Sequence, residues 1–200
     1  MSNAFDKAEL HRRRREEVVR TAAQAFSRNG FGNTSMDEVA LSLGISKATL
    51  YQYFKSKQEI LFQCHLLSIR HGEAGLELAQ RAEGSGLDRL LVFLRRYMTG
   101  AFGELGGLSM LGDITALTPE RREQVITKRA HISHMSDRLI EDGLRDGSIR
   151  RCDAKLAKLF AMGVVNWIPS WYSDQGERTA DEIVDAFIDF FTHSFAAPQG

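Results

Sequence analysis

Proline, cysteine and long apolar runs are all scarce in this chain of 200 residues. Only 3 Pro stand against 17 Gly, and no low-complexity tract or internal repeat is present, which excludes collagen-like, disordered and solenoid proteins. The most apolar stretch, residues 156–171, is interrupted by a lysine, an asparagine and a proline, so it falls short of the roughly 18 apolar residues of a membrane-spanning helix. Two cysteines, Cys64 and Cys152, cannot build a disulfide framework. Because the N-terminal segment is polar and lacks a secretory signal, we expect a cytoplasmic protein without a membrane segment.

No sign of charge is in excess overall, since the formal net charge is zero, but the charges are unevenly distributed. Residues 1–57 contain ten Lys or Arg and six Asp or Glu, whereas residues 58–200 contain sixteen and twenty. With 43% hydrophobic residues the chain has an ordinary globular composition. The basic N-terminal part suits a polyanion such as nucleic acid, although a solvated helix face rich in arginine explains the same excess.

Apolar residues recur at intervals of three and four through most of the chain, and the alternation typical of strands is almost absent. Serine or threonine followed three residues later by glutamate, a capping box that begins helices, occurs at Ser35, Ser56 and Thr179. Thr118 precedes a proline suited to the first turn of a helix, and Asp153 can cap another. We therefore predict an all-α fold of about nine helices, the clearest at residues 9–29, 36–43, 47–54, 57–83, 87–102, 119–146 and 154–168 and from 180 onward.

The most informative segment lies between Ser35 and Lys57. Two helices of about two turns each, joined at Gly44, bury too little surface alone and need the preceding helix behind them, which is the arrangement of a helix-turn-helix. We predict that Leu50 and Phe54 point into this three-helix core. The outer face of the second helix carries donors and aromatic hydroxyls with almost no acid, which suits the major groove of DNA. Its residues are Lys47, Ala48, Thr49, Tyr51, Gln52 and Tyr53.

The run from Thr34 to Leu61, and above all the part from Gly44 to Phe54, resembles the N-terminal domain of the TetR family of bacterial transcriptional regulators. The resemblance covers about 50 residues, and it departs mildly at Ala48, where the family often has glycine. It implies a homodimeric, all-helical repressor. A helix-turn-helix DNA-binding domain would occupy residues 1–56, and a larger helical domain for ligand binding and dimerisation would occupy residues 57–200.

The resemblance also assigns roles to individual residues, and the chemistry of their side chains agrees with it. Gln bonds adenine, Lys reaches guanine acceptors and the Thr methyl packs on a thymine methyl. The residues expected at base edges are Lys47, Thr49 and Gln52, and Ala48 belongs to the same DNA-binding face, where its departure from glycine alters a base contact. The groups expected at phosphates are Tyr51, Tyr53, Lys57 and the backbone amides of Ser35 and Met36 at a helix start. Packing into the core is the alternative for the two tyrosines.

One DNA-binding domain reads only a few base pairs, so binding to a roughly palindromic site needs a dimer with two such domains. The last two predicted helices are the candidates for the dimer interface. Both are strongly apolar, and the terminal one is apolar on more than one face, as a helix buried by its own subunit and by a partner would be. A wholly intramolecular core is the alternative. The expected interface residues are Phe160, Val164, Ile183, Phe187, Phe190 and Phe191.

Aromatic residues and methionines between the head and the dimerisation helices can line an adaptable apolar cavity, or equally fill an ordinary core. The candidate pocket residues are Phe93, Tyr97, Met98, Phe102, Met110, Leu111, Met135, Leu139, Met162, Asn166 and Trp167. The stretch from Asn166 to Tyr172 resembles members of the family that respond to fatty-acyl or other lipid-derived effectors.

No nucleophile elbow, phosphate loop or dinucleotide fingerprint is present, so we expect no enzyme. His131 and His134 lack further ligands at a recognisable spacing, so we expect neither a metal nor a cofactor.

We predict a DNA-binding transcriptional regulator, a homodimeric repressor that a small, apolar, fatty-acyl or lipid-derived effector releases from a palindromic double-stranded operator. One alternative keeps the DNA head on a structural or cell-division factor whose body binds a protein partner. Another is a helical enzyme with a vestigial head.

Overall fold

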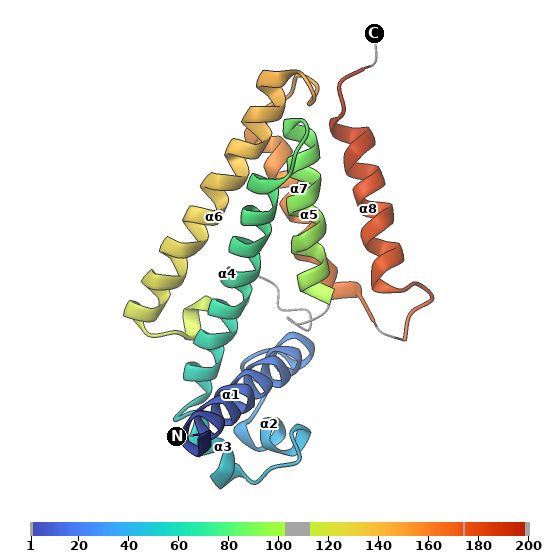
Figure 1. The fold of residues 1–200 in the computed structure, drawn as a ribbon. Helices are drawn as coiled ribbons and strands as arrows, with labels where there is room; N and C mark the ends of the chain where they lie inside the picture. The colour runs from blue at the N-terminus through green and yellow to red at the C-terminus, as the bar shows by residue number, and fades with distance from the viewer. Residues whose placement is uncertain (1, 103–112, 174, 199–200) are drawn as a thin grey trace.

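The computed structural model describes residues 2–102, 113–173 and 175–198, so the candidate pocket residues Met110 and Leu111 lie outside it. Within these ranges the chain forms eight α-helices, against about nine predicted, and the only strand-like feature is an isolated bridge between Ile149 and Ala196. The all-α prediction is confirmed (Figure 1). The helices are α1 (Ser2–Asn29), α2 (Met36–Ser42), α3 (Lys47–Tyr53), α4 (Lys57–Arg81), α5 (Gly86–Phe102), α6 (Pro119–Asp146), α7 (Ala154–Trp171) and α8 (Ala180–Phe195), with a 3₁₀ turn η1 (Ile114–Ala116) before α6.

The predicted caps begin most of these helices. Ser35 and Thr179 form complete capping boxes, and Thr118 and Asp153 accept hydrogen bonds from the first turns of α6 and α7. α7 runs past Pro169 to its end at Trp171, three residues beyond the end at residue 168 that the sequence predicted. A proline removes one backbone hydrogen bond, and here that loss falls in the last turn of the helix.

The first three helices form a compact head (Figure 1). Gly44 has a φ of +64°, which permits the tight turn in which the amide of Ile45 donates to the carbonyl of Ala40 at 3.0 Å. Leu50 and Phe54 are fully buried, as predicted, so the opposite side of α3 faces outward. The other buried apolar residues of the head are Val18, Val19, Ala22, Ala23, Phe26, Phe31, Met36, Val39 and Ala40.

α4 leaves the head and runs the length of the body (Figure 1). Near its start the thiol of Cys64 donates to the carbonyl of Val19 on α1, at 3.5 Å. Farther along, the backbone at Gly72 lies close to the side chain of Ile132 on α6. The buried side chains of the head and the body belong to one continuous hydrophobic cluster, and α4 contributes residues to both parts of it.

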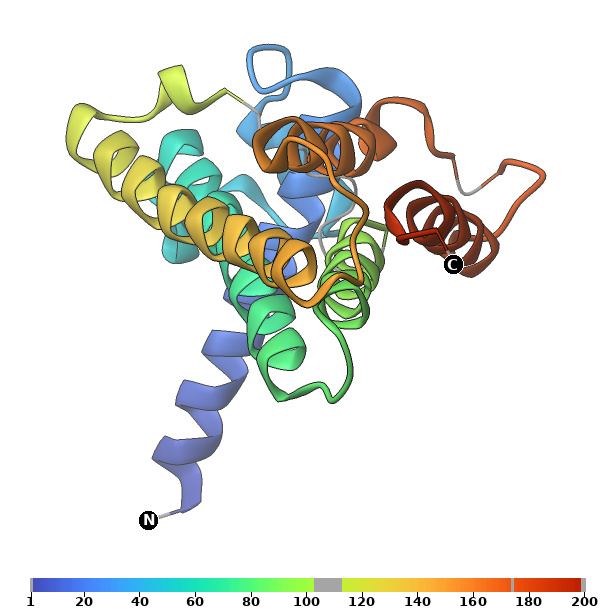
Figure 2. The ribbon, with the colours of Figure 1, turned by 90° about the horizontal axis from the view of Figure 1, so that it is seen from above.

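α5 lies at the centre of the body and contacts α4, α6, α7 and α8. Seen from above, α6 and α8 lie on opposite sides of it (Figure 2). The C-terminal end of α8 is tied to the link between α6 and α7, because the amide of Arg150 donates to the carbonyl of Phe195 at 2.8 Å. The body is therefore a bundle in which α4, α6, α7 and α8 all pack against α5.

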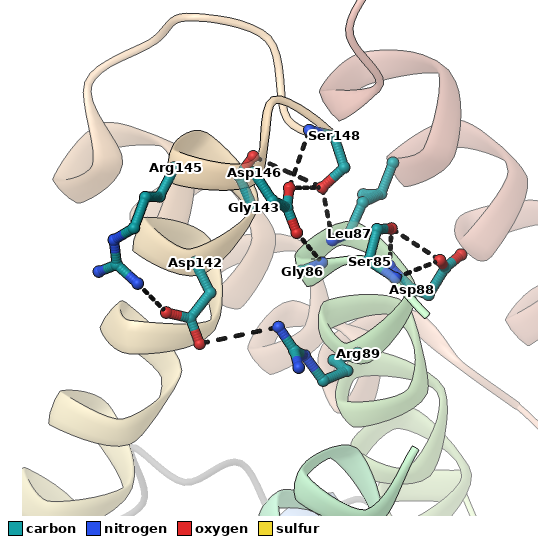
Figure 3. A network of polar contacts seen from close by, with 10 residues as sticks. All are labelled: Ser85, Gly86, Leu87, Asp88, Arg89, Asp142, Gly143, Arg145, Asp146 and Ser148. Atoms are coloured by element: carbon teal, nitrogen blue, oxygen red, sulfur yellow. Dashed lines mark hydrogen bonds and ion pairs between the residues drawn. The ribbon is translucent and has the colours of Figure 1, made fainter. Parts of the chain in front are cut away.

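The start of α5 is held by the end of α6 (Figure 3). Asp146 Oδ2 accepts the amide of Gly86 at 2.6 Å, and Ser148 Oγ accepts the amide of Leu87 at 3.0 Å. Ser148 donates in turn to Asp146 Oδ1 at 2.6 Å. The hydrogen bonds from Ser148, and then the one from Gly86, hold the pKa of Asp146 below its usual value. The ionised carboxylate thus caps α5 from another helix.

The two helices approach one another most closely at Gly86. A Cβ atom there would lie 2.2 Å from the amide nitrogen of Gly143 and 2.4 Å from its Cα. Both neighbours are backbone atoms, which cannot rotate away as a side chain can. Only glycine at residue 86 is compatible with this crossing.

We expect G86A to lower the free energy of unfolding by about 3 kcal/mol, because the added methyl group must push two backbones apart. Urea denaturation followed by circular dichroism measures it. The control is G32A, since a Cβ at Gly32 would meet nothing within 4 Å. An equal loss in both variants contradicts the close crossing.

Candidate nucleic-acid interface and effector-binding body

The outer face of α3 is open to solvent, as the sequence predicted. Its exposed residues are Lys47, Ala48, Tyr51 and Gln52. Thr49 is half-buried, and its hydroxyl lies 2.8 Å from that of Ser46, whose Oγ also caps the helix. Side chains at these positions share one surface at helical spacing, because Leu50 anchors the opposite side. The helix therefore presents donors and a phenol outward without an acidic residue.

Lys47 has a partner in this structure. Its Nζ lies 2.7 Å from Oδ2 of Asp37 on α2, and this hydrogen bond raises the pKa of Lys47. Both side chains are more than half exposed, so the pair is well solvated and contributes little to stability. Lys47 can therefore exchange Asp37 for a base edge at small cost.

The backbone amide of Ser35 also has an acceptor already. It donates to Oε2 of Glu38 at 2.6 Å, the reciprocal half of the capping box that begins α2. The side chain of Met36 is buried in the head core. A DNA phosphate at this helix start would have to displace the Glu38 carboxylate from the Ser35 amide, so a phosphate contact here stays a prediction.

Two further residues predicted at phosphates are engaged within the head. Tyr53 is half-buried against the core, and its carbonyl accepts a hydrogen bond from Arg15. The Nζ of Lys57 donates to the carbonyls of Phe31 at 2.6 Å and Thr34 at 2.8 Å, and it lies 4.3 Å from the centroid of the Phe31 ring. Lys57 thus clamps the start of α4 to the loop between α1 and α2. Its contact with phosphate stays a prediction.

Most of the candidate pocket residues turn into the body. Phe93, Tyr97, Met98 and Leu139 are buried, and Phe102, Met135, Met162 and Asn166 are half-buried. The Tyr97 hydroxyl donates to Oδ1 of Asn166 at 3.4 Å and so joins α5 to α7. Trp167 differs, because 67% of its surface is exposed on α7. Trp167 therefore does not lie with the other candidate pocket residues in the interior of the body.

The candidate dimer residues are divided in a similar way. Ile183 and Phe191 are buried within their own subunit, and Val164 and Phe187 are half-buried. Phe160 and Phe190 are 49% and 60% exposed. They belong to a larger exposed apolar surface, which we call the α7–α8 face and which consists of Leu156, Leu159, Phe160, Trp167, Trp171 and Phe190.

A groove of about 550 Å³ adjoins this face between the end of α7 and α8. Trp171, Ile183, Phe187 and Phe190 line it together with the connecting loop. The Trp171 and Phe187 rings meet edge to face with centroids 6.2 Å apart. The α7–α8 face is therefore an extended apolar surface with a hollow at one end.

Sequence analysis missed a polar pair in the body, a buried histidine and a half-buried arginine. His65 of α4 is fully buried, and its Nδ1 lies 2.9 Å from Nη2 of Arg129 on α6. Burial, and then the charge of Arg129, lowers the pKa of His65 to about 4. Nothing in the sequence marked these residues, because histidine and arginine on a helix usually face water.

Two other kinds of site are absent from the described ranges. No helix there is long and apolar enough to cross a bilayer. Nor does that part of the chain gather three or more histidine, cysteine or acidic side chains in a group that could hold a metal ion.

The chain is similar to known regulators over most of its length. It is 21% identical over 158 residues to the fatty acid metabolism regulator protein of Bacillus subtilis (strain 168), which covers 75% of this chain and 78% of that protein. The TetR family regulator PfmR from Thermus thermophilus matches it with a TM-score of 0.75 at 28% identity, over 88% of this chain and 97% of that one. AibR in complex with isovaleryl coenzyme A and operator DNA matches with a TM-score of 0.74 at 23% identity, over 90% and 98%.

Two family models match the two parts of the chain. Residues 18–64 match the model of bacterial regulatory proteins of the tetR family, and residues 83–195 match the tetracyclin repressor-like C-terminal domain. The first match spans the helix-turn-helix with its exposed α3 face, and the second spans α5 to α8. The chain belongs to the TetR family of DNA-binding transcriptional regulators.

Proposed function

We propose that this protein is a homodimeric repressor that binds a palindromic operator and is released from it by a small, apolar effector of the fatty-acyl class. The observation that carries the proposal is the outer face of α3, where Lys47, Tyr51 and Gln52 project into solvent from a short helix fixed by Leu50 and Phe54. A helix of this size, with donors outward and no acid, fits the major groove. The protein would act on the chromosome, in the cytoplasm.

The α7–α8 face supports the dimer. Isolated exposed apolar residues are common on proteins, but two tryptophans and two phenylalanines exposed on α7 and α8, which ring contacts join at Trp171 and Phe187, are typical of an interface. Within α7, the residues Leu156, Phe160, Trp167 and Trp171 follow one stripe at helical spacing. We infer that a second copy covers this stripe, with α7 and α8 of each subunit packed together.

The interior of the body supports an effector with an apolar part. Phe93, Tyr97 and Met98 place two aromatic rings and a thioether on one buried side of α5. The name of the Bacillus subtilis relative and the isovaleryl coenzyme A bound to AibR support the acyl class. A body that binds a protein partner, on the same DNA head, is the second candidate, and the α7–α8 face is the feature that favours it.

We expect Q52A to weaken binding to an operator, recovered by genome-wide mapping of bound sites, by about tenfold, because each base contact contributes about 1–3 kcal/mol. Y51F should instead weaken operator and random DNA alike, because a phosphate contact carries no sequence information. Fluorescence anisotropy at fixed salt measures both. The control is R81A, an exposed charge at the far end of α4. Operator affinity unchanged in Q52A would falsify the assignment of α3 as the base-reading helix.

We expect F190E to weaken dimerisation by about 30-fold or more, because a charge at an interface aromatic costs about 2 kcal/mol or more. Light scattering after size-exclusion chromatography measures the molar mass across a dilution series. The matched control is I126E, an apolar residue 46% exposed on α6. A dimer that persists in F190E and dissociates in I126E would place the interface elsewhere.

We expect an acyl-coenzyme A to lower the operator affinity of the wild-type protein by about tenfold, since allosteric coupling in such proteins is about 1–3 kcal/mol. Anisotropy titrations with isovaleryl, decanoyl and palmitoyl coenzyme A measure it, with free coenzyme A as the control. Unchanged affinity with every acyl chain favours the second candidate, in which the body binds a protein.

A further inference from the structure

Arg129 is a half-buried cation of the body with no carboxylate beside it in the ranges 2–102, 113–173 and 175–198. It lies on α6, faces α4 and α5, and forms no ion pair with a carboxylate among the residues that the structure describes. Burial lowers its pKa, but a guanidinium keeps its charge in proteins. Its Nε is buried and has no hydrogen-bond partner. The folded body thus holds a positive charge and a donor that no described group satisfies.

His65 adds a second unsatisfied donor next to the first. Arg129 can only donate, so Nδ1 of His65, 2.9 Å away, is the acceptor of that hydrogen bond. The imidazole is neutral near pH 7, and its one proton is therefore on Nε2. This Nε2 is buried without a partner. Among the described residues, two N–H groups from α4 and α6, one of them on a cation, thus lack an acceptor.

Tyr97 brings the third helix into this cluster. Its phenol is buried, donates to Asn166 of α7 at 3.4 Å, and is close enough to Arg129 for the charge to oppose the rise that burial causes in its pKa. Its ring lies 5.7 Å from that of Phe93. The polar cluster therefore borders the apolar interior that the proposed function assigns to the effector.

We propose that Arg129 and His65 form the head-group site of the effector, and that the effector carries an oxyanion in addition to its apolar chain. The oxyanion accepts hydrogen bonds from the guanidinium and from His65 Nε2, and the chain lies against Phe93 and its neighbours. Two buried N–H groups, Arg129 Nε and His65 Nε2, and a half-buried charge lack acceptors among the described residues, which costs free energy, and an incoming oxyanion removes this cost. This inference rests on the proposed function and narrows it, since it excludes purely neutral effectors.

The oxyanion can be the carboxylate of a free fatty acid or a phosphate of an acyl-coenzyme A, since both present oxygen acceptors with negative charge. Three probes with the same chain separate the cases: decanoate, decanoyl coenzyme A and the neutral decanol. Isothermal titration calorimetry gives the affinities of the wild-type protein for each. We expect decanoate or decanoyl coenzyme A to bind at least tenfold more tightly than decanol.

The decisive variant is R129M, which keeps an unbranched side chain and removes the charge. We expect it to lose the preference for the oxyanion while its affinity for decanol stays within about twofold of wild type. Its melting temperature without ligand should equal or exceed that of the wild type, because a half-buried charge and a buried donor without an acceptor have been removed. R129K keeps the charge and should restore part of the preference. R138M, an exposed arginine on the same helix, is the control.

Several outcomes overturn the inference. They are equal binding of the oxyanion probes by R129M and wild type, equal loss of decanol and decanoate in R129M together with a lower melting temperature, and no binding of any probe up to its solubility limit. The same variants separate this inference from the proposed function. Operator release by decanoyl coenzyme A that is equal in wild type and R129M contradicts the head-group site alone. Oxyanion binding that depends on Arg129 but leaves the operator bound contradicts the proposed repressor mechanism alone.

Discussion

The arrangement of the whole chain depends on α4, because this one helix is packed into both the head and the body. Its start is fixed by Lys57, whose ammonium holds the carbonyls of Phe31 and Thr34. About two turns from that start, it places His65 against Arg129. From Lys57 to His65 is eight residues, about 12 Å along a helix. A displacement of α4 in the body therefore reaches the loop that leads into α2 without passing through any flexible segment.

That geometry would let the proposed effector act on the head from a distance. The head core and the body core form one hydrophobic cluster, so the body cannot shift α4 without moving the helices packed on its first turns. An oxyanion held by His65 and Arg129 would pull on α4 and α6 together. Each head would move as a unit, and two heads on one duplex tolerate only a spacing that matches the helical repeat of DNA.

The features that were predicted correctly from the sequence are those that depend on residues close together in the chain. Capping boxes at Ser35 and Thr179, the turn at Gly44 and the inward positions of Leu50 and Phe54 all follow from short-range hydrogen bonding and helical spacing, and all are confirmed. The sequence also pointed to the TetR family, because the residues that carry the resemblance are consecutive in the chain. Which side of this short helix faces outward follows from helical spacing alone. These features need no knowledge of how distant helices pack.

What the sequence left open depends on packing between distant helices. The terminal helix is apolar on several faces, and only its position against α5 decides that Phe191 is buried while Phe190 is exposed. Arg129 has the same origin: its burial follows from the crossing of α6 over α4, which no local pattern encodes. The two candidate sites of the body thus share a cause. Helices placed for one core leave an exposed apolar face on α7 and α8, and a half-buried cation without a carboxylate among the described residues, and each of the two proposed sites would supply these contacts from a second molecule.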